Sequence, residues 1–315
     1  MLLSPKTLKD RGILGMNQRN LGYISRYNDR RKYPLVDNKL KTKRLAQEHD
    51  VSVPGLIAVV EQQHQIRAIN EQLNGADQFV VKPAKGSGGK GIWVIDGKTE
   101  TGFVKTSGAK VSPPDLARHL SNVLAGLYSL SGTPDVAIIE TLIEFDTVFS
   151  GLSFQGVPDI RLIVFKGYPV MAMLRCATQA SDGKANLHQG AIGVGLDIQT
   201  GTAVRAVQHG EPVTIHPDTG VDMLNISIPN WREFLLLAAN CYEMTGLGYI
   251  GTDLVLDKNR GPLLLELNAR PGLAIQIANH RGLLPRLRAI EAMAGTYRDP
   301  SARVEFSMDT FNRQY

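Results

Sequence analysis

The chain has 315 residues, of which 43% are hydrophobic and 21% charged, with a net charge of +5. It is an ordinary globular sequence, long enough for two or three lobes with their own cores. No apolar run approaches the roughly 18–20 residues of a membrane span, and two cysteines form neither a disulfide framework nor a zinc pattern. The basic start lacks the apolar core of a signal peptide, so we expect a cytoplasmic protein.

The positive charge is concentrated at the N-terminus. Residues 1–44 hold 12 Lys and Arg against 3 Asp, a balance of +9, so the remaining residues sum to −4. Such a basic arm can bind nucleic acid, an acidic peptide, or the protein's own phosphate ligand. Nucleic acid is the least favoured partner, because no recognised nucleic-acid module is present and aromatic residues are few.

The expected elements alternate between helices and mainly antiparallel strands, which makes the chain α+β. After an irregular arm with short helices (1–36), we expect helices at about 38–48, 62–73, 112–128, 230–245 and 283–294. We expect strands at 56–60, 78–82, 91–96, 136–142, 160–165, 170–175, 190–196, 203–207, 251–257 and 262–268. The tail after Gly295 is expected to be irregular.

The hairpin expected over residues 251–272 brings three oxygen ligands together. Folding it about Asn259 and Arg260 places Asp253 opposite Glu266, and the pleat returns Asn268 to the same face. Two unpaired carboxylates among leucines would be costly, and a hard cation such as Mg²⁺ would neutralise both. The alternative is two acids in surface salt bridges.

A glycine-rich loop joins two of the expected strands. The sequence Lys85-Gly-Ser-Gly-Gly-Lys90-Gly91 provides backbone N–H groups and lysines for phosphate oxygens. It is not a Walker loop, since no Ser or Thr follows Lys90 and no helix follows the loop. Lys82 precedes it inside an apolar strand, where an ammonium group needs an anion beside it. The alternative is a mobile surface hairpin without a ligand.

These motifs together resemble the ATP-grasp ligases. Lys39, Val-Val-Lys82-Pro, the glycine-rich hairpin, Ile139-Glu140-Thr-Leu142 and Asp253…Glu266-Leu-Asn268 occur in the family's order. Asp159-Ile-Arg161, Arg175 and Asn186-Leu-His188-Gln-Gly190 resemble a series in RimK-type α-L-glutamate ligases. The likeness covers roughly residues 37–290. It implies an ATP-grasp fold of two α+β lobes that grip ATP (37–142 and 143–295), a reduced pre-grasp segment (1–36) and a tail (296–315).

The resemblance also implies a role for each group of residues. The phosphates of ATP would be contacted by Lys39, Lys82, Lys85, Gly86, Ser87, Gly88, Gly89, Lys90 and Gly91. The rest of the nucleotide would be bordered by Glu140, Thr141, Leu142, Asp159, Lys184 and Asn186. Arg161 and Arg175 would be catalytic, on the γ-phosphate or an acyl phosphate, and the alternative is that they are structural ion-pair partners. Asp253, Glu266 and Asn268 would hold two Mg²⁺ ions, with Mn²⁺ as an alternative metal.

The function implied is ATP-dependent ligation of a carboxylate to an amine through an acyl phosphate. Glutamate or another amino acid would be added to a small-molecule or peptide acid. The candidates for substrate contacts are Arg19 on the arm, His188 and Arg270. Two other functions stay open, a non-catalytic ATP-binding module and a ribosome- or RNA-associated protein. A homo-oligomer is compatible with the sequence.

Overall fold

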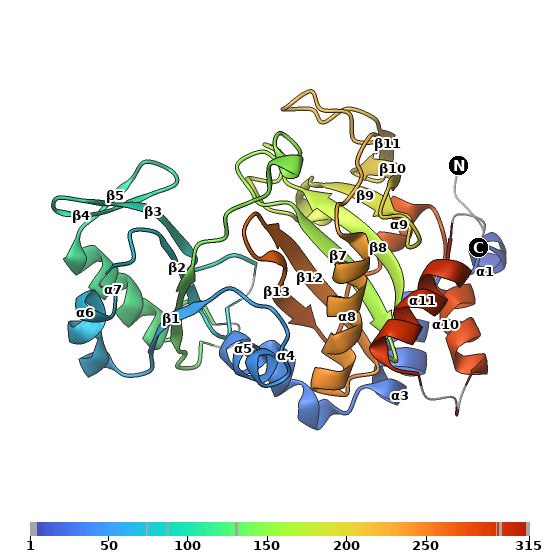
Figure 1. Cartoon of the computed structure of the whole chain (residues 1–315), viewed down its shortest axis with the longest axis horizontal. Coiled ribbons are helices and arrows are strands. Elements are labelled where there is room, and N and C mark those ends of the chain that lie inside the picture. The colour runs from blue at the N-terminus through green and yellow to red at the C-terminus, as the bar shows by residue number, and fades with distance from the viewer. Residues whose placement is uncertain are drawn as a thin grey trace. The chain divides into compact units, whose positions relative to one another are not determined.

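The computed structural model describes residues 5–73, 75–86, 88–129, 132–293, 295 and 298–312. The chain forms two compact units (Figure 1). We refer to Asp37–Arg44 with Val53–Glu144 as the small unit. Met1–Val36, Leu45–Ser52 and Phe145–Tyr315 form the large unit.

The small unit is built on a six-stranded antiparallel sheet in the order β1-β6-β2-β3-β4-β5. Its strands are β1 (Leu56–Val60), β2 (Phe79–Pro83), β3 (Trp93–Thr99), β4 (Gly102–Lys105), β5 (Lys110–Val111) and β6 (Ala137–Thr141). Its helices are the start of α5 (Lys39–Glu48), the 3-10 helix η3 (Gln63–Ala68), α6 (Ile69–Gln72) and α7 (Pro113–Leu124).

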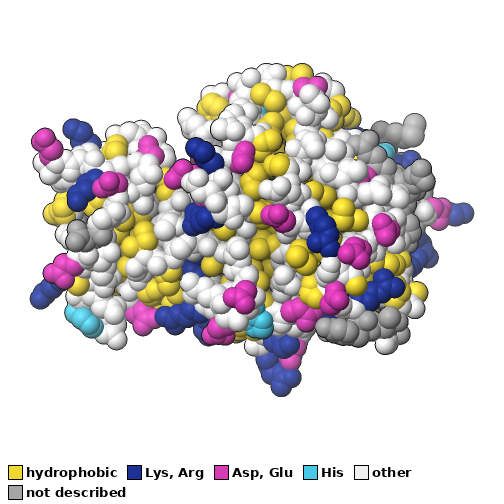
Figure 2. All heavy atoms as spheres, viewed as in Figure 1, with side chains coloured by type: hydrophobic (Ala, Val, Ile, Leu, Met, Phe, Trp, Pro, Cys, Tyr) yellow, Lys and Arg dark blue, Asp and Glu magenta, His cyan; other side chains and the backbone are white. Residues whose placement is uncertain are grey.

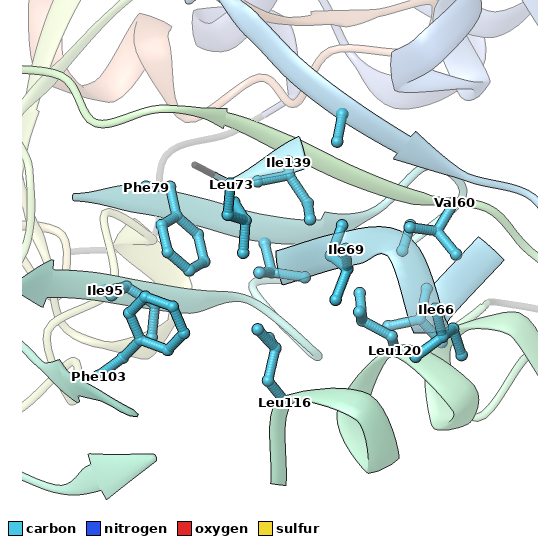
Figure 3. Packing of buried hydrophobic residues seen from close by; sticks show 14 of the residues in the cluster. Val60, Ile66, Ile69, Leu73, Phe79, Ile95, Phe103, Leu116, Leu120 and Ile139 are labelled. Atoms are coloured by element: carbon cyan, nitrogen blue, oxygen red, sulfur yellow. The ribbon is translucent and has the colours of Figure 1, made fainter. Parts of the chain in front are cut away.

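Most of the buried apolar side chains of this unit form one cluster, and Leu40, Ala84 and Ile138 form a smaller one. Figure 3 shows Phe79, Ile95 and Ile139 of the sheet packed against Leu116 and Leu120 of α7. These five side chains are fully buried, and each stabilises the fold by roughly 1.5–3 kcal/mol. The first turn of α7 is capped as its sequence predicts, with the side chains of Ser112 and Asp115 bonding each other's backbone N–H.

The large unit is built on a seven-stranded antiparallel sheet in the order β11-β10-β9-β8-β7-β12-β13. Its strands are β7 (Asp159–Phe165), β8 (Tyr168–Cys176), β9 (Ile192–Leu196), β10 (Ala203–Gln208), β11 (Glu211–Val213), β12 (Tyr249–Asp257) and β13 (Gly261–Asn268). The helices that contact this sheet are α8 (Trp231–Thr245), α9 (Ile275–Asn279), α10 (Leu284–Ala292) and α11 (Pro300–Thr310). Two short 3-10 helices, η4 (Thr147–Phe149) and η5 (Leu187–Gln189), lie in its loops. The predicted α+β class is confirmed.

A β-bulge sets the register of the β12–β13 hairpin. Asp253 pairs with Glu266, as the symmetry of the sequence predicts, but Asp257 pairs with Gly261 and Leu254 with Leu264. A hairpin folded symmetrically about Asn259 and Arg260 would pair Asp257 with Pro262, so that part of the predicted register is wrong. The extra residue on β13, Leu265, restores the Asp253–Glu266 pair and bends the strand where the acidic residues lie.

The N-terminal arm consists of short helices that pack on the large unit. They are α1 (Pro5–Asp10), α2 (Met16–Gln18), the π-helix η1 (Arg19–Ile24), α3 (Ser25–Tyr27), the 3-10 helix η2 (Arg30–Lys32) and α4 (Pro34–Asp37). The rings of Tyr23 and Tyr27 meet Phe165 edge-on, at centroid distances of 5.5 and 4.9 Å. The side-chain amide of Asn28 donates to the carbonyls of Tyr249 (2.7 Å) and Ala269 (3.1 Å) and accepts from the Tyr249 N–H (2.8 Å). This part of the arm is therefore an integral layer of the large unit.

Part of the arm's positive charge is neutralised by the chain itself. Arg31 forms an ion pair with Asp29 at 2.6 Å, and Arg26 lies 3.7 Å from Glu291. On the face drawn in Figure 2, basic and acidic side chains are intermixed. The charge of the arm is therefore partly balanced within the fold.

Two further expectations are corrected. The expected helix at 62–73 is a 3-10 helix followed by one short α-helical segment, η3 and α6. The stretch after Gly295 was expected to be irregular, but it contains α11, capped by Asp299 and packed on α8 and β8. None of the described helices is long and apolar enough to cross a membrane.

The attachment of the arm can be tested at Asn28. Asn28→Ala leaves one buried N–H and two buried carbonyls short of a partner, so we expect a loss of about 3 kcal/mol in unfolding free energy. Urea unfolding, compared with the exposed arm variant Asn20→Ala, measures it. Equal midpoints for the two variants would show that the amide does not anchor the arm.

Candidate functional site

A row of charged residues crosses one face of the large sheet. Strand pairing places Asp253 between Arg161 on β7 and Glu266 on β13. Asp159 pairs with Arg175 of β8 and lies two residues from Arg161, so it faces the same side. Four neighbouring strands therefore bring these charges into one cluster.

The arginines of this cluster bind its carboxylates. Arg161 contacts both oxygens of Asp253, with 2.6 Å between Nη2 and Oδ2. Arg175 holds both oxygens of Asp159 at 2.5 Å, and its Nη2 lies 3.0 Å from Asp253 Oδ2. The amide of Asn268 donates to the same Asp253 oxygen at 3.3 Å. The sequence predicted that these residues lie together and preferred phosphate over ion-pair partners for the arginines, whereas in the structure both arginines pair with aspartates.

The cluster's electrostatics follow from burial and from these contacts. Burial opposes ionisation of Asp253, but Arg161 and Arg175 outweigh it and hold the pKa of Asp253 below its usual value. Asp159 has one close guanidinium partner, and burial raises the pKa of Asp159. Burial lowers the pKa of Arg175, but the two aspartates raise it by more. The pKa of Arg175 is therefore above its usual value. Asp253 is thus the more strongly ionised of the two acids.

The donor set fits a hard divalent cation. Asp253, Glu266 and Asn268 offer two carboxylates and an amide oxygen on one face, and Mg²⁺ commonly takes a few such ligands together with phosphate oxygens. Among the described residues, no group of three or more His, Cys, Asp and Glu gathers as a metal site. Because arginines engage Asp253 in this structure, a cation there would have to share or replace these contacts.

A second buried charge cluster lies in the small unit. Lys82, 6% exposed, bonds Glu140 Oε2 at 2.5 Å. Lys43 lies 2.9 Å from Glu140 Oε1 and also donates to the carbonyl of Pro54. The anion expected beside Lys82 is therefore Glu140. Sequence reasoning missed Lys43, although its position four residues after Lys39 on a predicted helix placed both lysines on one face.

The glycine-rich loop joins β2 to β3 as predicted. Lys39 Nζ donates to the Gly86 carbonyl at 2.8 Å, and Lys85 N–H donates to both oxygens of Asp135 at 3.1 and 3.0 Å. Gly88 and Gly89 have φ of 61° and 75°, and a Cβ added to either would meet no atom within 4 Å. The middle of the loop is thus open, and Lys90 is exposed. Ser87 lies outside the described residues.

A stack of side chains fixes the end of this loop, and no sequence pattern indicated it. The rings of Trp93 and His119 lie 3.8 Å apart and nearly parallel, with Lys105 Nζ 3.4 Å from the Trp93 centroid. His119 Nε2 lies 3.0 Å from the Gly91 carbonyl. Gly91 is required here, because its φ is 75° and a Cβ would lie 2.5 Å from the Tyr128 ring.

The remaining candidates are more dispersed. The N–H and hydroxyl of Thr141 both bond Gly55, so these groups are engaged within the small unit, and Leu142 follows directly after β6. Lys184 pairs with Asp182 at 3.0 Å, and the Asn186 side chain caps the short helix that carries the exposed His188. Lys184, Asn186 and His188 therefore share the loop between β8 and β9.

The two arginines predicted to contact substrate make different interactions in the structure. Arg19 donates to the Pro271 carbonyl at 2.9 Å, which ties the arm to the segment after β13. Arg270 instead stacks over the ring of Tyr33, at 5.3 Å. Cys176 and Cys241 are free and buried, and burial raises the pKa of Cys241 to about 12. Neither thiol is suited to act as a nucleophile.

The two antiparallel sheets, the lysine- and glycine-rich β2–β3 loop and the acidic β12–β13 hairpin define an ATP-grasp protein. The chain belongs to the sugar-transfer associated ATP-grasp family, whose sequence profile matches residues 18–292. The ATP-grasp part of the sequence prediction is confirmed, and glutamate specificity stays a prediction. None of the curated protein sequences matches the chain.

Three solved structures match this chain at low sequence identity. The ATP-grasp ligase PsnB, complexed with a phosphomimetic variant of a minimal precursor, Mg and ADP, is 13% identical with a TM-score of 0.44, over 84% of this chain and 60% of that one. The D-cycloserine synthetase DcsG is 16% identical with a TM-score of 0.48, over 96% and 82%. D-alanine–D-alanine ligase from Bacillus anthracis complexed with ATP is 14% identical with a TM-score of 0.45, over 90% and 68%. This chain thus spans 60% of the length of the PsnB chain.

The anchor of the glycine-rich loop predicts a pH dependence. Burial lowers the pKa of His119 from 6.5 to about 4, so between these values the unfolded chain binds a proton that the folded one does not. The contribution of His119 to stability is therefore present above pH 6.5 and lost as the pH falls toward 4. His119→Phe keeps a flat ring beside Trp93 and removes this dependence.

Thermal unfolding from pH 7 to pH 4 measures the effect, with the exposed His64→Phe in the same unit as the control. The wild type and the control should lose stability more steeply than His119→Phe. Parallel profiles for all three proteins would contradict a neutral, buried His119.

Proposed function

We propose that the protein is an ATP-dependent carboxylate–amine ligase that forms an amide through an acyl phosphate. The observation that carries the proposal is the Arg161–Asp253–Glu266 row with Arg175 and Asn268 beside it. It combines two guanidinium groups for phosphoryl oxygens with oxygen donors for a hard cation on one face of one sheet. Family membership supports the nucleotide and the reaction class.

The reaction has two steps. A carboxylate oxygen of the acid attacks the γ-phosphorus of ATP, the bond to the β-phosphate oxygen breaks, and ADP leaves. An amine then attacks the acyl carbon, loses a proton, and displaces inorganic phosphate to form the amide. Since charge builds on the transferred phosphoryl group, positioning and neutralisation are the protein's main contribution. No Ser or Cys nucleophile takes part.

In the large unit, Arg161 and Arg175 would neutralise the phosphoryl oxygens. Both are held by Asp253 in the structure, with side chains 12% and 14% exposed. Asp253, Glu266 and Asn268 would hold Mg²⁺, which when bound would supply positive charge to the ATP phosphates. A guanidinium released from Asp253 by such a cation keeps its full charge and its paired N–H donors for phosphate.

In the small unit, lysines and the glycine-rich loop would bind the phosphates of ATP. Lys82 and Lys39 supply charge, and the open glycines at 88 and 89 leave backbone N–H groups accessible. Glu140 would keep Lys82 in place until the phosphate arrives. Lys43 and Lys82 share the single carboxylate of Glu140, so these three side chains carry a net positive charge that suits an anion.

The proposal also extends to the identity of the amine and the acid that are ligated. Glutamate as the added amine follows from the likeness to RimK-type ligases. The family's association with sugar transfer makes sugar acids reasonable members of a substrate panel. ADP release that requires both an added acid and an added amine, followed by the mass of the product, tests the reaction. ADP release independent of both would indicate a non-catalytic or purely hydrolytic ATP-binding protein.

The metal ligands give the first kinetic prediction. Asp253→Asn and Glu266→Gln keep the side-chain shape but remove charge from the cation site, so we expect acid- and amine-dependent ADP release to fall about 100-fold or more. The exposed Asp222→Asn in the same unit should match wild type. Near wild-type turnover of either ligand variant at saturating Mg²⁺ would contradict the proposal that Asp253 and Glu266 hold the metal needed for the reaction.

The second kinetic prediction separates the two clusters. Lys82→Ala should mainly raise the KM for ATP, because Lys82 is proposed to bind nucleotide phosphates. Arg175→Lys keeps a charge beside Asp159 but loses the two-pronged contact, so it should mainly lower kcat. Steady-state kinetics at varied ATP measure both parameters. A rise in ATP KM of the same size in both variants would contradict this division.

A further inference from the structure

A cavity of about 890 Å³ lies within the large unit between the arm and the segment around α9. Its volume is in the range of sites for drug-sized molecules, larger than one amino acid needs. Several apolar side chains in its lining are left exposed, including Met16 (68%), Ile277 (52%) and Leu8 (37%). Exposed apolar groups gathered in a concave site indicate a ligand with an apolar body.

The charged groups of this cavity are all of one kind. Arg11, Arg19 and Arg281 line it together with His188 and His280, and none of the described lining residues is Asp or Glu. Arg19 uses three of its five N–H groups on Asn20 and Pro271. The cavity therefore suits an anion, and with both Arg11 and Arg19 in its lining it can hold a second one.

The wall that the arm contributes is held in place by buried hydrogen bonds. Gln276 of α9 accepts from the N–H groups of Leu14 (2.8 Å) and Leu283 (3.0 Å) and donates to the Leu14 carbonyl (3.1 Å). The backbones of Gly12 and Gly282 approach so closely that a Cβ on Gly282 would lie 2.0 Å from the Gly12 oxygen. The cavity is thus a preformed feature of the fold.

One end of the cavity adjoins the charge cluster on the sheet. Gly272 and Arg19 line it, and Arg19 bonds the carbonyl of the preceding Pro271. Pro271 packs on β12 at Gly251, where a Cβ would lie 2.7 Å from Pro271 and 3.5 Å from Arg161 Cδ. A molecule in the cavity can therefore present one end toward Arg161.

We propose that this cavity binds the acid substrate of the ligase, and that the acid is amphipathic, with a hydrocarbon body and a second anionic group. This inference depends on the proposed function for the step that consumes the acid. The reacting carboxylate would lie at the Arg19 end, the hydrocarbon body against Met16 and Ile277, and the second anionic group at Arg11. Sugar acids and free glutamate, which lack the hydrocarbon body, fit the lining poorly.

Binding can be measured without ATP by using anilinonaphthalene sulfonate, a fluorescent anion with an apolar body, and displacing it with dodecanedioate. Ile277→Glu places a negative charge in the cavity, whereas Ile215→Glu makes the same change at an equally exposed isoleucine outside it (52% and 50% exposed). We expect about a tenfold or greater loss of probe affinity for Ile277→Glu. Arg11→Glu should act likewise, with the exposed Arg30→Glu of the same arm as its control.

Dodecanedioate should displace the probe from wild type, and glucuronate and glutamate should not. Equal probe affinity in Ile277→Glu and Ile215→Glu would overturn the cavity proposal, as would Ile277-dependent sedimentation with phosphatidylglycerol vesicles, which would indicate a lipid surface. Ligation of a sugar acid with a KM unchanged by Ile277→Glu would overturn the cavity proposal but would agree with the proposed ligase function. Displacement by dodecanedioate without ligation of any acid would support the cavity and contradict the proposed ligase.

Discussion

Asp253 lies on β12, beside the edge strand of the seven-stranded sheet, with 3% of its surface exposed, and the rest of the large unit's site depends on how its charge is neutralised. A buried carboxylate is stable only when paired and hydrogen-bonded. The neighbouring strands supply both needs, since Arg161 lies opposite Asp253 on β7 and Arg175 reaches it from β8. On the other side, the bulge at Leu265 keeps a second acid, Glu266, beside Asp253, and two neighbouring carboxylates favour a cation between them.

In the small unit the buried charges that need a partner are positive. Glu140 pairs with two buried lysines, Lys43 and Lys82, beside a sheet that otherwise buries apolar side chains. In both units, buried cations proposed to bind phosphate are paired with internal counter-ions, namely Arg161, Arg175 and Lys82. Such pairing keeps long side chains ordered, so less conformational entropy is lost when a charged ligand takes the counter-ion's place. The protein's charges can thus be both stable and available.

The sequence predicted the features that depend on local pattern. Hairpin symmetry placed Asp253 opposite Glu266, and the glycines between two apolar runs placed the loop between β2 and β3. The bulge at Leu265 was not predictable, because no glycine or turn residue marks it. Contacts across long stretches of chain were also beyond prediction, such as Asn28 bonding Tyr249, which lies 221 residues away. The pairing of Arg161 and Arg175 with Asp253 depends on sheet order, and strand patterns alone do not determine that order.

The central claim is that the acid's own oxygen attacks the γ-phosphate of ATP. An acid substrate carrying a heavy oxygen isotope in its carboxylate tests it most directly, with the mass of the inorganic phosphate measured after ligation to the amine. The account predicts that each amide formed releases one phosphate containing one labelled oxygen, because the bridging oxygen of the acyl phosphate leaves with phosphorus. Label found in AMP, or unlabelled phosphate accompanying the amide, would contradict it.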